Sequence, residues 1–458
     1  MTLYEYIENL KDKKIAVIGV GVSNTPLIEK LLKQGCNVTA CDKRTAEELG
    51  EDYTRLEAMG AKFMLGEDYL ENLDFDVVFR TPGLMPFDPH LEQVRKSGGV
   101  VTSEMEIFFA LCPCKIIAIT GSDGKTTTTT IISELLKAQG YNVHIGGNIG
   151  RPLLCDVDEM IESDFVVLEL SSFQLHSMNC KPNVAVITNI SPNHLDKHKD
   201  YKDYYDAKAS IFLKQTADER LVLNHENEFS EYYAGMAKAD IAYFSRTCEL
   251  KNGVYSDDKL IYRVNNGSKS VIMAIDDIKL PGTHNLENYM AAFAATQEYV
   301  DDSVCEDVAK TFNGVEHRLE RVRELNGVVY INDSIGTSPT RTAAGLHALK
   351  VKPILIAGGY DKHIPFETLG DDICQYVKKL YLTGATAEKI ADVVRASKYY
   401  TEDFPMVIMD DFKETVLAAA DFAEAGDIVL LSPACAAFDK FKNFMERGEF
   451  FKQIVMEL

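Results

Sequence analysis

The stretch "IAITGSDGKTTTT", residues 117–129, decides the fold expected for the middle of this chain. The apolar run at its start reads as a buried strand, and "TTTTTIISELLKAQG" is typical of a helix that ends at Gly140. Five consecutive threonines are poor helix formers, so a functional start to the helix explains them better than propensity does. Strand, glycine turn and helix together indicate a parallel α/β domain.

The turn itself, "TGSDGKT", has the chemistry of a phosphate-binding loop. Backbone N–H groups of such a turn, and the positive end of the helix dipole behind it, face a bound phosphate. Lys125 would reach the terminal phosphates, and the hydroxyl of Thr126 would bind Mg²⁺. The strict G-x-x-x-x-G-K-[ST] pattern is not met, because Ile119 takes the place of its first glycine. A plain structural turn is the alternative interpretation.

Strand-like and helix-like runs alternate along the rest of the 458 residues. The alternation predicts α/β domains with parallel sheets, and a chain of this length is expected to form several domains. We predict a Rossmann-like domain over 1–103 and a second one over 315–458. Between them, 104–314 would form a central ATP-binding domain of the P-loop type, with a hairpin-like region near 240–280.

Composition argues against several classes of protein. The net charge of −22 disfavours nucleic-acid binding, because that binding depends on neutralising phosphates with Lys and Arg. The N-terminal sequence lacks the pattern of a signal peptide, and no window is apolar enough to span a membrane. The ten cysteines lack framework spacing and are expected to be buried thiols. We therefore expect a cytoplasmic, monomeric protein without nucleic-acid or membrane partners.

A second glycine motif, "VIGVGVSN" at 17–24, is a rival cofactor loop. A dinucleotide-binding fingerprint reads G-x-G-x-x-G. Gly19 and Gly21 fit this pattern, whereas Asn24 stands at the third glycine. Asp42, at the end of the next predicted strand, is placed to bond a ribose hydroxyl. On these residues alone, a nucleotide site and a tight turn are equally good interpretations.

Other predicted strands also end in polar groups. Glu169 follows an apolar run, where a carboxylate could bind Mg²⁺ beside Thr126. His194 and His198 have a zinc-like spacing, but no H-E-x-x-H pattern or obvious third ligand accompanies them. A polar loop that faces the phosphates is the better interpretation of this segment. In the third predicted domain, the positive groups that could hold an anionic substrate are Arg341 and Lys362.

Taken in order, the motifs resemble the ATP-dependent Mur ligases of peptidoglycan synthesis, and among them the members that add D-glutamate. The resemblance covers nearly the whole chain. It is carried by "TGSDGKT", "GGNIG" (146–150), "ELSSFQL" (169–175), "NHLDKH" (193–198), "DAK" (206–208), "HNLEN" (284–288), "EHR" (316–318), "NDS" (332–334) and "LLSPACA" (430–436).

The resemblance implies a role in ATP and metal binding for single residues. Thr126 and Glu169 would bind one Mg²⁺ and His194 a second, with Lys208 carbamylated to provide an anionic metal ligand. The catalytic residues would be Lys125, Glu169, His194 and Lys208. ATP would be held by Gly121, Ser122, Asp123, Gly124, Lys125, Thr126, Thr127, Asn285, Asn288, Arg318 and Asp333.

The resemblance also implies where the other substrates bind. The first domain would hold the uridine diphosphate of UDP-N-acetylmuramoyl-L-alanine rather than NAD. Its contacts would be Val22, Ser23, Asp42, Arg44, Thr81, Pro82 and Gly83, with Asn148, Ser171 and His194 on the muramoyl part. D-Glutamate would be bound by Thr337, Lys362 and Phe444.

Two residues depart from the family pattern. Ile335 stands where the family commonly has lysine, and Ala437 where it has serine. We hypothesise that Arg341 or His363 replaces part of this lost polarity. A KM for D-glutamate that is unchanged in Arg341→Ala and His363→Ala would contradict the hypothesis.

The implied reaction uses ATP to convert the alanyl carboxylate to an acyl phosphate, which the amine of D-glutamate then attacks. Another Mur ligase or a folylpolyglutamate synthase-like ligase is the nearest alternative. A dinucleotide-binding oxidoreductase or sensor would rest on "VIGVGVSN" alone.

Overall fold

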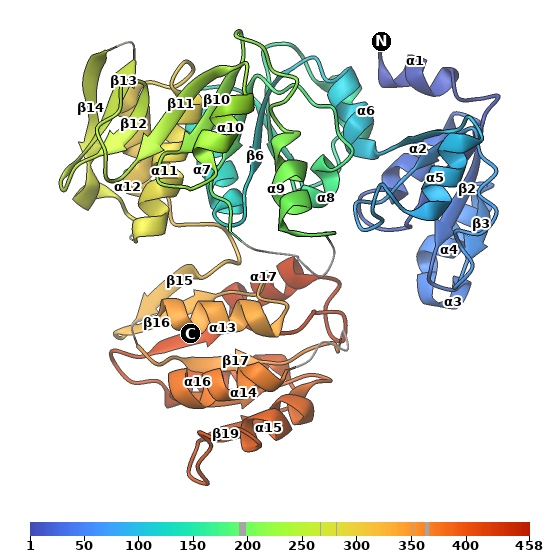
Figure 1. Ribbon diagram of the computed structural model, residues 1–458. Coiled ribbons are helices and arrows are strands. Elements are labelled where there is room, and N and C mark those ends of the chain that lie inside the picture. Colours follow the sequence, from blue (N-terminus) through green and yellow to red (C-terminus); the bar gives the residue numbers. More distant parts are fainter. Residues whose placement is uncertain (192–197, 266, 281, 350, 362–365) are drawn as a thin grey trace. The chain divides into compact units, whose positions relative to one another are not determined.

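The computed structural model describes residues 1–191, 198–265, 267–280, 282–349, 351–361 and 366–458. These residues form two compact units, Met1–Phe312 and Asn313–Leu458. The first unit contains two sheets and the second unit one, each flanked by helices (Figure 1). The predicted α/β class with mainly parallel sheets is therefore confirmed. Every helix in the described part of the chain is too short or too polar to cross a bilayer.

The N-terminal sheet has five parallel strands in the order β3-β2-β1-β4-β5. The order reverses at β1, and in open α/β sheets ligands bind beside such a reversal, at the carboxyl ends of the strands. The strands are β1 (Lys14–Ile18), β2 (Asn37–Asp42), β3 (Lys62–Leu65), β4 (Val77–Phe79) and β5 (Val100–Thr102). The accompanying helices are α1 (Leu3–Glu8), α2 (Thr25–Lys33), α3 (Ala46–Leu49), α4 (Glu51–Ala58) and α5 (Pro89–Lys96).

The central sheet has the order β14-β13-β12-β11-β10-β9-β6-β8-β7. It is parallel as far as β12, and β12, β13 and β14 pair antiparallel, as the hairpin-like sequence predicts. The strands are β6 (Lys115–Thr120), β7 (Val143–Gly147), β8 (Phe165–Glu169), β9 (Val184–Ile187), β10 (Arg220–Asn224), β11 (Asp240–Ser245), β12 (Gly253–Ser256), β13 (Leu260–Asn265) and β14 (Ser268–Ala274). The helices are α6 (Glu104–Leu111), α7 (Lys125–Ala138), α8 (Ser172–Leu175), α9 (Tyr201–Ala209), α10 (Ser230–Met236), α11 (Thr283–Thr296) and α12 (Asp302–Thr311), with 3₁₀ turns at Leu154–Glu159 and Ile275–Asp277.

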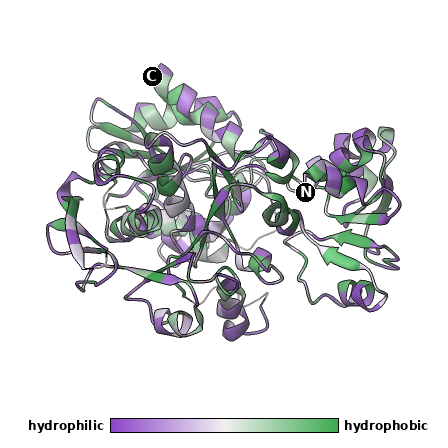
Figure 2. Cartoon of the chain, turned by 90° about the horizontal axis from the view of Figure 1, so that it is seen from above, coloured by the Kyte–Doolittle hydropathy of each residue, from purple (hydrophilic) through white to green (hydrophobic). Residues whose placement is uncertain are grey.

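Strand β6 carries hydrophobic side chains on both faces. Ile116 and Ala118 belong to one hydrophobic core, whereas Ile117 and Ile119 belong to the core under α7 and α11. A strand covered on both faces reads as a continuous apolar run rather than an alternating one, and the strands are accordingly mostly green in Figure 2. The glycine loop therefore starts from a strand that is buried from its second residue to its last.

The second unit contains one sheet in the order β15-β16-β20-β17-β18-β19. Only β15 is antiparallel to its neighbour. The strands are β15 (Glu320–Leu325), β16 (Val328–Asn332), β17 (Ile354–Ala357), β18 (Lys379–Leu382), β19 (Met406–Ile408) and β20 (Ile428–Leu431). The helices are α13 (Pro339–Ala348), α14 (Glu367–Tyr376), α15 (Ala387–Arg395), α16 (Phe412–Phe422) and α17 (Phe444–Glu457).

Each predicted domain range contains one of the three sheets, and the first two ranges together make up the first compact unit. Their separation into independent domains stays a prediction.

Candidate functional site

The glycine loop connects β6 to α7 and has a backbone that only glycine adopts easily. Gly121 and Gly124 have φ values of 148° and 77°, in the region where a Cβ is unfavourable. A side chain on Gly121 would also overlap the hydroxyl of Thr188, and one on Gly124 would overlap the side-chain oxygen of Asn288. Both glycines are therefore required for conformation and for space.

Residues after β9 hold this loop in place. Thr188 Oγ1 donates to the carbonyl of Asp123 at 2.6 Å, and Asn189 Oδ1 accepts from the backbone N–H of Asp123 at 2.9 Å. Ser122 Oγ lies 2.8 Å from the hydroxyl of Tyr204 on α9. These supporting residues were missed by sequence reasoning, although the "TN" pair directly after an apolar strand was a usable signal.

Thr126, in the first turn of α7, meets Glu169, the last residue of β8, as predicted. Thr126 Oγ1 donates to Glu169 Oε2 at 2.7 Å, and Asn148 Nδ2 donates to Glu169 Oε1 at 2.8 Å. The carboxylate is buried. A hydroxyl and a carboxylate oxygen this close are a hard-oxygen donor set of the kind that Mg²⁺ prefers, so these residues fit the metal that the sequence implies.

Lys125 and Lys208 converge on one carbonyl of the loop. Lys125 Nζ donates to Gly121 O at 3.0 Å, and Lys208 Nζ donates to the same oxygen at 2.8 Å. Lys208 is only 2% exposed. Burial, followed by the positive charge of Lys125, lowers the pKa of Lys208 well below its usual value. This amine therefore has a strong tendency to be neutral.

A hydrogen-bonded network connects α8 to α9. Ser172 Oγ lies 2.9 Å from His198 Nε2, His198 Nδ1 lies 2.9 Å from Asp203, and His176 Nε2 lies 2.8 Å from the other oxygen of Asp203. His176, His198 and Asp203 offer donor atoms close enough to hold a metal ion, and the hydrogen bonds also satisfy them without one. His194, predicted as a metal and substrate ligand, lies outside the described residues.

The predicted nucleotide residues of α11 are also beside the loop. Asn285 and Asn288 are buried, and Asn288 accepts a hydrogen bond from Thr128 Oγ1 at 3.2 Å. Asn288 is thus next to the glycine loop, whereas Arg318 and Asp333 belong to the second unit.

Several predicted substrate residues line one pocket of the first unit. Val22, Ser23 and Pro82 come from the N-terminal sheet, and Asn148 comes from the central one. The same pocket is lined by Arg80, Glu104 and Gln174, which sequence reasoning missed. Ser171 caps α8 by accepting from the backbone N–H of Gln174. The pocket thus gathers polar groups from both sheets of this unit.

Asp42, Arg44 and Thr81 line a second pocket, beside Gly19. Asp42 accepts from the backbone N–H of Val20 at 2.7 Å and pairs with Arg44 at 2.9 Å. Burial works to raise the pKa of Asp42, but the hydrogen bonds from Arg44 and Val20 outweigh it and lower the pKa. The residue is therefore an ionised carboxylate with a cationic partner.

Asn24, at the third glycine position of the rival motif, has a structural task. Its amide donates to the carbonyl of Ile18 at 2.8 Å and is buried. In the dinucleotide fingerprint, glycine at this position allows helix and strand to pack closely. Here the side chain of Asn24 occupies that position.

Glu104 is a buried acid at the start of α6. It accepts from the backbone N–H of Leu154 at 2.9 Å. Burial raises its pKa to about 7, against the opposite effect of the backbone N–H groups of Leu154 and Leu153.

We expect Glu104→Gln to stabilise the protein at pH 8 and to leave it nearly unchanged at pH 5. The pKa of Glu104 in the folded protein lies above its usual value of 4.5. The protonated acid therefore makes its full stabilising contribution below pH 4.5, and this contribution is lost as the pH rises through 7. At pH 8 the wild type carries a cost of about 3 kcal/mol that neutral glutamine avoids. Urea denaturation at both pH values measures the difference. An equal gain at pH 5 and pH 8 would contradict the assignment.

In the second unit, Asp333 follows β16 at the carboxyl edge of the sheet. It accepts from Ser432 Oγ at 2.7 Å and from the backbone N–H of Leu319 at 3.2 Å. Burial raises its pKa to about 6, although these hydrogen bonds act to lower it. Thr337 lies on the loop after β16 and Phe444 is the first residue of α17, whereas Lys362 and His363 are outside the described residues.

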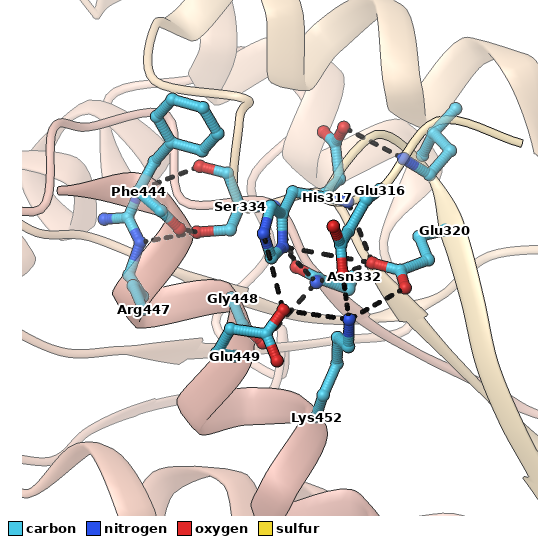
Figure 3. Close-up of polar contacts among 12 residues, drawn as sticks. Glu316, His317, Glu320, Asn332, Ser334, Phe444, Arg447, Gly448, Glu449 and Lys452 are labelled. Carbon is cyan, nitrogen blue, oxygen red and sulfur yellow. Dashed lines mark hydrogen bonds and ion pairs between the residues drawn. The ribbon is translucent and has the colours of Figure 1, made fainter. Parts of the chain in front are cut away.

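A group of acids in this unit surrounds a lysine rather than a free space. Glu316, His317 and Glu449 have donor atoms close enough for a metal ion. Lys452 Nζ, however, lies 2.5 Å from Glu316 and 2.9 Å from Glu449 (Figure 3). Because an ammonium already neutralises these carboxylates, the group is better explained as an ion-pair network than as a metal site.

Comparison with known proteins gives consistent results along the chain. The model of the Mur ligase middle domain matches residues 119–296, and that of the Mur ligase glutamate ligase domain matches 317–435. A UDP-N-acetylmuramoylalanine–D-glutamate ligase from Acetivibrio thermocellus is 51% identical, with 99% of this chain and 98% of the relative covered. The protein of that name from Clostridium novyi is 49% identical, with 100% and 99% covered.

Solved structures support the same fold. UDP-N-acetylmuramate-alanine ligase MurC from Thermotoga maritima superimposes with a TM-score of 0.55 at 17% identity, covering 97% of this chain and 99% of its own. MurF ligase from the same organism, in complex with ADP, has a TM-score of 0.52 at 15% identity, covering 98% and 97%. At these identities the likeness concerns the fold alone.

Proposed function

The chain belongs to the Mur ligase family, with the ATP-dependent ligases that add D-glutamate to UDP-N-acetylmuramoylalanine in peptidoglycan synthesis, and from this premise we propose how its residues carry the reaction. The observation that supports the proposal most is the convergence of Lys125, Lys208, Thr126 and Glu169 on one glycine loop. These residues provide positive charge and oxygen ligands where a triphosphate would lie.

ATP binds with its phosphates on the loop of residues 121–127. Backbone N–H groups and the start of α7 face the phosphates, and Asn285 and Asn288 hold other parts of the nucleotide. By the family resemblance, Arg318 and Asp333 are further residues that bind the nucleotide. Lys125 offsets negative charge on the transferred phosphoryl group.

Two Mg²⁺ ions, when bound, neutralise the charge on the phosphates and on the carboxylate that is to be activated. Thr126 and Glu169 would hold one of them. His194 and Lys208 would hold the second, with Lys208 as a carbamate.

The surroundings of Lys208 support its proposed carbamylation. Only a neutral amine has a free electron pair to form the N–C bond with CO₂, and one proton is lost as the carbamate forms. The burial that lowers the pKa of Lys208 therefore promotes this step. The carbamate then offers the hard oxygen ligands that an amine lacks.

The chemistry activates a carboxylate, which by itself is a poor acyl donor. The γ-phosphoryl group of ATP passes to the alanyl carboxylate and gives an acyl phosphate. The amine of D-glutamate attacks the acyl carbon, phosphate leaves, and the amine loses a proton as the amide forms. Uridine diphosphate lies over Val22, Ser23, Asp42, Arg44 and the segment 81–83, and Asn148 and Ser171 contact the muramoyl part.

The test is phosphate release from ATP with UDP-N-acetylmuramoyl-L-alanine and one amino acid at a time. We expect D-glutamate to stimulate release, whereas L-glutamate, L-lysine and no amino acid do not, and the product to be heavier by one glutamyl residue. Stimulation by another amino acid would assign the chain a different acceptor. No stimulation by any of them would contradict the proposed reaction, and folate acceptors would be tried next.

The substrates are a nucleotide-linked sugar, a free amino acid and ATP, so we place the enzyme in the cytoplasm. Size-exclusion chromatography checks the expected monomer.

A further inference from the structure

Arg447, in the first turn of α17, is a buried arginine that the proposed reaction leaves without a role. The residue is only 2% exposed. Nε donates to Ser334 Oγ at 3.0 Å, and Nη2 donates to the carbonyl of Ser334 at 3.0 Å. Nη2 also donates to Cys435 O at 3.0 Å, and Nη1 to Ala436 O at 3.1 Å. Figure 3 shows the guanidinium facing Ser334.

Arg447 lies where loops that follow three neighbouring strands come together, and its hydrogen bonds join two of these loops. Ser334 comes after β16, Cys435 and Ala436 come after β20, and β20 lies between β16 and β17. Gly359, after β17, packs against the same place, because a Cβ there would overlap the carbonyl of Ala436 and lie 3.1 Å from Arg447 Nη1. Ligands of parallel sheets bind at this carboxyl edge, so one side chain fixes the edge where a substrate is expected.

The same side chain fixes the start of its own helix. Ser334 Oγ, which accepts from Arg447, donates to the carbonyl of Phe444 at 2.7 Å. Arg447 thus connects the segment 333–337, the segment 434–437 and Phe444. Thr337 and Phe444 are two of the three residues proposed to bind D-glutamate.

The hydrogen-bond acceptors of Arg447 carry no charge, and the negative charge of Asp439 acts to raise its pKa. All four acceptors are neutral oxygens, and among the described residues no carboxylate forms an ion pair with it. Burial lowers its pKa to about 10, so the group stays protonated at neutral pH. A buried charge without a directly paired counter-ion is costly, and a bound anion nearby would offset part of that cost.

We propose that Arg447 is a positioning residue for the amino-acid substrate: it holds the two loops and Phe444 in register and makes this edge selective for an amino acid with a second carboxylate. The inference rests on the proposed D-glutamate ligation and deepens it. It also accounts for how a segment with Ile335 and Ala437, which carry no polar side chain, still serves an acidic substrate.

The test compares Arg447→Met and Arg447→Lys with the wild type in the phosphate-release assay. Methionine keeps much of the bulk and removes both the charge and the hydrogen bonds. Lysine keeps the charge but loses the planar fork. We expect Arg447→Met to raise the KM for D-glutamate roughly 10- to 100-fold, with much smaller changes in KM for ATP and for the UDP-linked substrate. We also expect it to reduce the preference for D-glutamate over D-glutamine, which Arg447→Lys largely retains.

Arg323→Met is the matched control. Arg323 also donates to carbonyls of α17, at 2.9 Å to Val455 and 3.1 Å to Met456, but at the other end of the helix. Its loss should lower stability without changing the KM for D-glutamate. Circular dichroism shows whether Arg447→Met is folded. If it is not, Arg447→Lys tests the inference instead, with an expected rise of about tenfold in the KM for D-glutamate alone.

An unchanged KM for D-glutamate in a folded variant would overturn the inference, and so would a parallel rise in all three KM values. A wild-type enzyme that fails to use D-glutamate would instead refute the proposed function. The wild-type reaction therefore separates the two failures.

Discussion

Replacing Lys125 with methionine lowers kcat/KM by roughly three orders of magnitude, because a positive charge at the glycine loop is lost where negative charge is shifted between phosphoryl oxygens. The ammonium lies within 3.0 Å of two carbonyls of that loop. Methionine retains most of the length of the chain and the helix start. Steady-state phosphate release, with every substrate varied, measures the loss.

Lys137→Met is the control for this variant. Lys137 lies in the last turn of the same helix and pairs with Glu134 on the surface, at 2.8 Å. Surface pairs of this kind contribute little, so we expect its activity to equal that of the wild type. A Lys125→Met enzyme that keeps more than about a tenth of wild-type kcat would show that the lysine does not stabilise the transferred charge.

Replacing Lys208 with alanine abolishes measurable turnover, and added acetate or formate restores part of it. The variant removes the amine that is proposed to become a carbamate, and it leaves a buried space beside Gly121 and Thr120. A small carboxylate fits such a space and offers the same type of oxygen ligand. Activity titrated against acetate, with chloride at equal ionic strength, measures the recovery.

Lys202→Ala, on the exposed face of the same helix, serves as the control and should be unaffected by acetate. Lys202 is paired with Asp206 at the surface. If Lys208→Ala is inactive and no carboxylate restores activity, while the variant remains folded, the carbamate proposal fails and the lysine acts by another route.

Local sequence patterns predicted the parts of the fold that are both long and fully buried. Strand β6 and helix α7 could be recognised because an apolar run, a glycine turn and a helical pattern follow one another without a break. No predicted strand corresponds to β3, β7, β15 or β19. They lie at the edges of their sheets and are partly exposed, so their sequences lack the hydrophobic signal of a central strand.

The pairing of Thr126 with Glu169 could be predicted because Glu169 ends one apolar strand and Thr126 lies in the first turn of the helix that follows the glycine loop after another. The contacts of Thr188 and Asn189 with the loop depend on β9 lying beside β6, and a single sequence does not reveal strand order. Arg447 was missed for the same reason. Its partners Ser334 and Cys435 are 113 and 12 residues away in the chain, and they meet only because β16 and β20 are neighbours.

The bracing of the glycine loop has a thermodynamic consequence. Asp123 is held on its N–H and its carbonyl by residues after β9, and Ser122 is held by Tyr204. A loop that is already ordered loses little conformational entropy when it receives a ligand, and ordering costs are a large part of what weakens binding. Calorimetry should therefore find a small entropic penalty for nucleotide binding, with the heat of the new phosphate contacts providing most of the affinity.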